Sequence, residues 1–197
     1  MPNYCDGAVT FYASDERIQD VLNTIKTDDN SFDFNKIIPM PKELDVTISV
    51  SDDLAYVAFI CDGERRSIEE FHTLASSSKE KAVAYNQLSS GFHFSENYIE
   101  EYHNRYLETW DAEKIPEMLD EGNKLVSNLL KYGSPTWYEW NCKNWGTKWN
   151  SIDAYMNGNS ICFYTAWSPC SPVIKALSEM FPDVRIEYYY DEAGMCF

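Results

Sequence analysis

The chain has 197 residues, of which 44% are hydrophobic and 15% aromatic, so it can bury a core and wholesale disorder is excluded. Its net charge of −16 disfavours direct binding of nucleic acid, because phosphate contacts need an excess of Lys and Arg. The longest apolar run, residues 54–61, is far too short to span a membrane, and the first residues show no signal-peptide pattern. We therefore expect a soluble cytoplasmic protein that contacts no membrane.

The N-terminal third predicts a strand, a helix and a short extended segment. Residues 4–12 are typical of a strand, and Ser14 is placed to cap a helix whose apolar residues recur at helical spacing over 18–25. Residues 32–41 begin with alternating aromatic and polar side chains, which predicts an extended segment that two prolines lead off the sheet. Residues 54–61 are compatible with a strand or a buried helix, and their Tyr, Val, Phe and Ile content favours a strand.

The middle of the chain, residues 65–132, is mostly helical in pattern. A run from Ser95 to Trp110 places aromatic and apolar residues at three- and four-residue steps. Leucines and a valine supply a further helical stripe over 119–130, and Gly133 stands where a helix commonly ends on glycine.

The last third alternates strands and a helix. Residues 151–156 and 160–167 predict a hairpin, because an Asn-Gly-Asn turn separates them. A helix is expected over 172–181, with Ser171 as its N-cap and a proline at its first position. Residues 184–190 alternate again and predict a final strand.

Strand, helix and strand at both ends of the chain predict the α+β class, with a ferredoxin-like split βαβ antiparallel sheet and helices packed on one face. The simplest assembly is a single domain over residues 1–197. Its ferredoxin-like core is expected to come from 1–61 and 135–197, with a helical insertion at 62–134.

The densest aromatic segment, residues 137–150, holds four of the six tryptophans. It is either core that pins a long loop onto the sheet or a surface that binds a partner, and aromatic stripes are more often core. Gly146 permits a sharp bend or a close approach of backbone. If the segment is a binding site, Asn144 and Lys148 are the leading polar contacts. The candidate binding residues are Trp137, Trp140, Asn144, Trp145, Lys148, Trp149 and Asn150.

The sequence shows neither a nucleophile paired with a base nor a phosphate-binding glycine loop, so we expect no catalytic residues and no cofactor. The three histidines are too far apart for a metal-binding pair on one helix face, and we expect no metal. Six cysteines without a signal sequence are expected to stay reduced. Cys170 lies near a helix N-terminus but has no identified base, and Asp191-Glu192 is interpreted as a turn.

Three patches carry a family resemblance: residues 32–44, the tryptophan segment 137–150, and residues 165–194 with Thr-Ala-Trp-Ser-Pro and Phe-Pro-Asp. In this order they resemble the YubB-like family of phage and plasmid accessory proteins, which have a ferredoxin-like domain. The resemblance implies that fold and a mobile element in a bacterium as the genetic setting, but no established reaction. Cys170 stands where relatives often have a second proline. The sequence ends at Phe197, where relatives tend to continue, so we expect a short final strand.

Acidic residues are concentrated in two stretches. Residues 1–64 hold 13 acids and 4 bases, and residues 96–135 hold 9 acids and 4 bases. This favours a cationic partner or imitation of a polyanion, whereas the simpler alternative is a solvated surface that serves solubility alone. The acidic candidates in the second stretch are Glu96, Glu100, Glu101, Glu108, Asp111, Glu113, Glu117, Asp120 and Glu121. Helical register is expected to bring four of them to one side, namely Glu113, Glu117, Asp120 and Glu121.

These patterns predict an acidic, non-catalytic accessory protein of a phage or plasmid, acting in the cytoplasm of the bacterial host. Its expected partner is a host protein with a basic surface, whose handling of nucleic acid in defence it inhibits or modulates. Two alternatives stay open: a small regulatory or housekeeping protein of the mobile element, and an enzyme of unrecognised type. Such an enzyme would centre on Cys170 or on Asn144 and Lys148. The partner's identity and the oligomeric state are left open.

Overall fold

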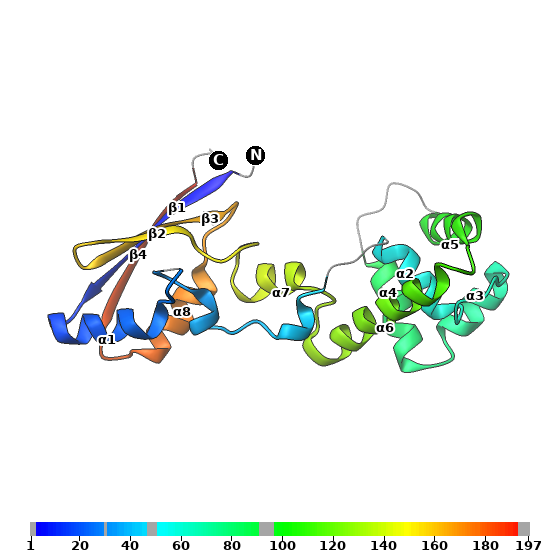
Figure 1. The fold of residues 1–197 in the computed structure, drawn as a ribbon, viewed down its shortest axis with the longest axis horizontal. Coiled ribbons are helices and arrows are strands. Elements are labelled where there is room, and N and C mark those ends of the chain that lie inside the picture. The colour runs from blue at the N-terminus through cyan, green and yellow to red at the C-terminus, as the bar shows by residue number, and fades with distance from the viewer. Residues whose placement is uncertain (1–2, 30, 47–50, 91–96, 193–197) are drawn as a thin grey trace. The chain divides into compact units, whose positions relative to one another are not determined.

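The computed structural model describes residues 3–29, 31–46, 51–90 and 97–192 and divides the chain into two compact units (Figure 1). The sheet unit comprises Met1–Lys42 and Trp137–Phe197, and the helical unit comprises Glu43–Thr136. The expected helix start at Ser95 and the acidic candidate Glu96 lie outside the described residues.

The sheet unit is built on four antiparallel strands in the order β2-β3-β1-β4. Its strands and two crossover helices are β1 Tyr4–Tyr12, α1 Asp15–Ile25, β2 Ile152–Asn157, β3 Ser160–Ala166, α8 Ser171–Met180 and β4 Arg185–Glu192. Because β3 lies between β1 and β2, and β1 lies between β3 and β4, the two strand–helix–strand units interlock as a split βαβ pair. The expected α+β, ferredoxin-like fold is confirmed.

The inner face of this sheet carries the core. Buried and exposed side chains alternate along β1, where Cys5, Val9 and Phe11 are buried, as period-two geometry requires. Helices α1 and α8 cover this face (Figure 1) and bury their apolar stripes. Ser14 caps α1 as expected, since its hydroxyl accepts a hydrogen bond from the backbone of Arg17.

The helical unit is organised around one apolar helix. Its helices are α2 Asp52–Ile60, α3 Ile68–Ala75, α4 Lys79–Ser89, α5 Tyr98–Thr109 and α6 Ile115–Tyr132. Almost all of α2 is buried, and it packs against α4, α5 and α6. Gly133 ends α6 in the left-handed conformation (φ 68°), as expected.

The strand favoured for residues 54–61 is wrong, because most of this run forms α2. A helix surrounded by other helices is apolar on every side, so its sequence lacks the periodicity that separates helix from strand. The run also lies in the helical unit, which begins at Glu43, whereas we expected it in the ferredoxin-like core.

The extended segment expected at 32–41 is also wrong. The chain forms a short 3₁₀ helix there, η1 Phe34–Lys36, and a second one, η2 Lys42–Leu44, follows directly after the segment. The Asp33 carboxylate starts η1 by accepting a hydrogen bond from the backbone of Asn35 at 3.0 Å. A local side-chain cap therefore overrides the aromatic–polar alternation.

Smaller differences occur at the C-terminal end of the sheet. Cys170, one residue earlier than expected, is the N-cap of α8. Asp191 and Glu192 belong to β4 and not to a turn, because they pair with Asp6 and Cys5 of β1. The final strand therefore has 8 residues and is longer than its alternating sequence indicated.

Gly122 tests the packing of α6 on α2. A Cβ atom at this position would lie 2.5 Å from the carbonyl oxygen of Ala55 and 2.9 Å from Cβ of Phe59. We expect Gly122→Ala to lower the free energy of unfolding by about 1–3 kcal/mol through overpacking, although alanine is the better helix former. Urea unfolding measures this. The exposed Ser127→Ala on the same helix is the control, and equal stability of both variants would contradict the packing.

His103 predicts an acid sensitivity of the helical unit. Its ring is buried against Phe71, its Nε2 lies 3.1 Å from the carbonyl oxygen of Arg66, and burial lowers its pKa. The unfolded chain therefore takes up this proton first as the pH falls below about 6.5, which reduces stability. Urea unfolding at about pH 7.5 and about pH 5.5 should show a smaller loss in His103→Gln than in wild type. His72→Gln retains His103 and its burial and should keep most of the loss; an unchanged loss in His103→Gln would refute the assignment.

Candidate functional site

Two tryptophans of the segment 137–150 belong to the core of the sheet unit. The segment begins with helix α7, Trp137–Asn144, and Trp140 and Trp145 are only 8% and 3% exposed. The Trp145 indole donates a hydrogen bond to the carbonyl oxygen of Ile38 at 2.9 Å and packs edge-on against Phe34. Both indoles therefore serve packing, and Trp145 fixes the segment that follows α1.

Two asparagines of the segment form hydrogen bonds within the sheet unit through their side-chain amides. Asn144, one of the two expected polar contacts, donates to the carbonyl oxygen of Trp140 within its own helix at 2.9 Å. Asn150 accepts a hydrogen bond from the backbone of Phe34 at 2.8 Å and donates to the carboxylate of Asp33 at 2.6 Å. These amides hold an irregular stretch in place, so neither is a ready contact for a partner.

Gly146 shows the close approach that its sequence position indicates. Its φ is +79°, and a Cβ atom would lie 2.8 Å from Cδ of Pro172 and 3.0 Å from the carbonyl oxygen of Pro169. The Ser168 hydroxyl donates to the Gly146 carbonyl oxygen at 2.7 Å. The turn after α7 is therefore packed directly on the loop before α8.

Lys148 lies on the solvent side of the same segment. Its Nζ is 4.8 Å from the ring centre of Trp149, 5.3 Å from that of Tyr138 and 6.0 Å from that of Trp167. All three rings are exposed, and Trp167 has a left-handed backbone (φ 73°), which is strained for a bulky residue. Of the sequence candidates in this segment, Trp149 is therefore exposed, whereas Lys148 and Trp137 are half-buried.

The outer face of the sheet is a second accessible surface, and sequence reasoning missed it. It is the face opposite α1 and α8, and five of its tyrosines are exposed: Tyr4, Tyr12, Tyr155, Tyr164 and Tyr189. Between them stand the charged residues Asp6, Arg185, Glu187 and Asp191. Part of the signal was present, because tyrosine or charge stands at alternate positions throughout 185–189 and at positions 4, 6 and 12 of the first strand.

The acidic candidates at and near α6 differ in exposure. Glu113 lies before the helix begins at Ile115, and Glu121 is only 8% exposed among the buried residues of α6. Glu117 and Asp120 are exposed, and Asp120 pairs with Lys124 at 2.5 Å. Helical register does place Glu121 near Glu117 and Asp120, but Glu121 is buried, so it adds little to an exposed acidic surface.

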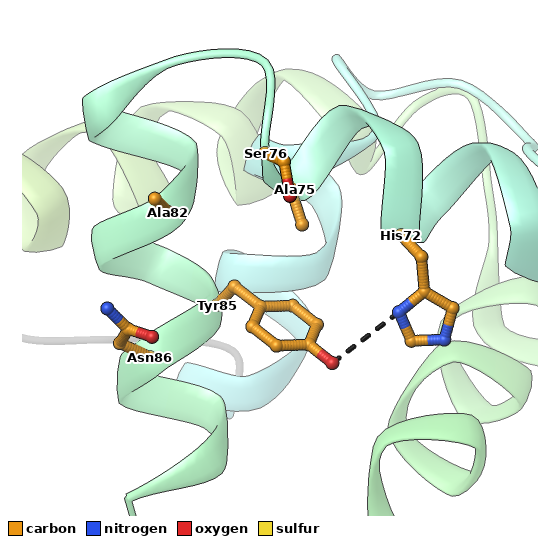
Figure 2. Close-up of a pocket in the computed structure, with 6 residues that line it drawn as sticks. All are labelled: His72, Ala75, Ser76, Ala82, Tyr85 and Asn86. Atoms are coloured by element: carbon orange, nitrogen blue, oxygen red, sulfur yellow. Dashed lines mark hydrogen bonds between the residues drawn. The ribbon is translucent and has the colours of Figure 1, made fainter.

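The helical unit has a hollow of about 340 Å³ between α3 and α4 (Figure 2). Its lining is His72, Ala75, Ser76, Ala82, Tyr85 and Asn86. The Tyr85 hydroxyl lies 3.4 Å from Nδ1 of His72, as the dashed line shows. Because the Tyr85 hydroxyl lies against Nδ1 of His72, we assign no chemistry to this hollow.

Cys170, the other catalytic candidate, is fully buried in the sheet unit. Burial raises the pKa of its thiol to about 12, and its Sγ lies 3.6 Å from the hydroxyl of Tyr188. A thiol in this state is a poor nucleophile at neutral pH. Across the part of the chain that the structure describes, no group of three or more His, Cys, Asp or Glu is placed to hold a metal ion.

The geometry defines a ferredoxin-like α+β protein with two accessible aromatic surfaces and a separate helical unit. Residues 144–197, which supply β2, β3, α8 and β4, match the family model of the ferredoxin-like domain in Api92-like protein. The crystal structure of protein api92 from Yersinia pseudotuberculosis is similar at 12% identity, with 99% of this chain and 92% of that chain covered and a TM-score of 0.40. No curated protein matches the chain. None of the described helices is both long and apolar enough to cross a membrane.

Trp145→Ala tests the structural role of the tryptophan segment. Because it removes a buried indole with a hydrogen bond to Ile38, we expect the free energy of unfolding to fall by roughly 3 kcal/mol or more. Chemical unfolding of Trp149→Ala, which removes a partly exposed indole, is the control and should show a much smaller loss. If Trp145→Ala unfolds like wild type yet loses a partner, the segment is an interface instead.

Proposed function

We propose that this chain is an acidic accessory protein of a phage or plasmid, as its resemblance to the YubB-like family implies. In this proposal it binds the basic surface of a host protein that handles nucleic acid and inhibits or modulates it. It acts by occupying that surface, not by catalysis. The Api92-like match covers the ferredoxin-like domain and is compatible with this proposal.

The charge of the helical unit supports the proposal most directly. Residues 43–136 hold 18 acidic and 8 basic residues, a net charge of −10. The α5–α6 carboxylates, defined as Glu100, Glu101, Glu108, Glu117 and Asp120, are all exposed. A concentration of one sign of charge accelerates association with an oppositely charged groove and competes there with a polyanion.

The contrasting function is that of a regulatory or housekeeping protein whose charge serves solubility alone. Partner capture distinguishes the two, because steering by charge weakens as salt rises. The wild-type chain, immobilised, would be exposed to bacterial lysate at low and at high salt. We expect it to retain a nucleic-acid-binding protein at low salt and to release it at high salt.

A matched pair of variants tests the three α5 members of the α5–α6 carboxylates. The test variant carries Glu100→Gln, Glu101→Gln and Glu108→Gln. The control carries Asp28→Asn, Asp29→Asn and Glu179→Gln, exposed acids of the sheet unit, and changes the net charge equally. We expect the test variant to lose most of the captured protein and the control to keep it. Capture that ignores both salt and these substitutions would defeat the proposal.

A further inference from the structure

One end of the outer sheet face carries its own arginine. The guanidinium carbon of Arg185 lies 5.0 Å from the ring centre of Tyr12, and Arg185 also pairs with the carboxylate of Glu187. The Tyr12 hydroxyl donates to Glu187 at 2.8 Å, which closes the group. A guanidinium over a tyrosine face, with a carboxylate beside it, satisfies both the positive charge and the planar donors of arginine.

The other end of this face repeats the carboxylates and the aromatic rings. Asp6 and Asp191 are exposed and stand directly opposite each other on β1 and β4. Tyr164 is opposite Asp6 on β3, and its ring centre lies 6.0 Å from that of Tyr4. Tyr189 precedes Asp191 on the same face of β4 and is 68% exposed.

Among the residues that the structure describes, this end has no counterpart of Arg185. The described strand neighbours of Asp6 and Asp191 on this face are tyrosines and Ala8, and neither carboxylate forms an ion pair with a described residue. Two like charges directly opposite on neighbouring strands destabilise a sheet. A guanidinium placed between them would relieve this repulsion and stack on the flanking rings.

We propose that the outer sheet face binds an arginine-bearing segment of a basic partner protein, with a guanidinium held between Asp6 and Asp191 and against Tyr4 and Tyr164. The inference rests on the proposed function, since it names a surface and a side chain for the same basic partner. Arginine is favoured over lysine because its planar fork matches a pair of carboxylates and stacks on aromatic faces.

Calorimetric titration of the full chain with two synthetic peptides tests this. One peptide alternates Gly and Arg, and the other, of equal length and charge, alternates Gly and Lys. We expect the Arg peptide to bind at least about tenfold more tightly than the Lys peptide. Equal affinity for the two peptides would overturn the proposal, because it would reduce the effect to net charge.

Variants locate the binding. Asp6→Asn combined with Asp191→Asn should weaken the Arg peptide by about tenfold or more, whereas Asp28→Asn with Asp29→Asn, an equal change of charge in the same unit, should alter it less than about twofold. Tyr164→Leu keeps apolar area but removes a ring face, so it should reduce the preference for Arg. Equal weakening by the two double variants would overturn the proposal.

Thermal unfolding shows whether the double variant is folded, and the proposal also predicts the direction in which its melting temperature changes. Because Asp6→Asn with Asp191→Asn removes a like-charge pair, this variant should melt at the same temperature as wild type or higher while it loses the peptide. A lower melting temperature would contradict the repulsion on which the inference depends. The two proposals can fail separately. A chain that does not bind the Arg peptide can still capture a protein from lysate through the α5–α6 carboxylates, and a chain that captures nothing can still bind the Arg peptide.

Discussion

An aromatic cluster beneath the sheet holds together the two places where the chain leaves and re-enters the sheet unit. Phe32 and Phe34 follow α1, Trp145 precedes β2, and Phe163 belongs to β3; their rings meet edge to face. Hydrogen bonds from Ser151 to the carbonyl oxygen of Phe32 and from Trp145 to Ile38 reinforce the junction. Bringing together two segments that are separated by residues 43–136 costs conformational entropy, and the contacts of this cluster help to offset it.

This junction explains why the tryptophan segment is so dense. Part of it packs inward to close the loop, and part of it, around Lys148 and Trp149, remains at the surface. The same fourteen residues therefore combine a buried part with a part that reaches the surface, and binding by the surface part stays a prediction. Burial separates the two, since Trp140 and Trp145 belong to the core whereas Trp149 is accessible.

The sequence predicted the sheet well and the surfaces poorly. Residues 4–12 and the hairpin after Ser151 alternate clearly and are bounded by turn residues, so their strands could be assigned. The apolar run at 54–61 could not, although Ser51 with Asp52 and Asp53 after it resembles a helix start. Glu121 and the outer-face tyrosines depend on which face other elements cover, and no local pattern contains that information.

The opposed carboxylates of Asp6 and Asp191 have a consequence for the protein in concentrated solution. A sheet face with five exposed tyrosines favours self-association, because two copies placed face to face would stack their rings. In a pair that superposes the same ends of the two faces, the two acidic residues of each copy would be brought against those of the other. Their mutual repulsion opposes self-association while leaving the face open to a positively charged chain. The same two side chains thus reduce the tendency of this tyrosine-rich face to self-associate.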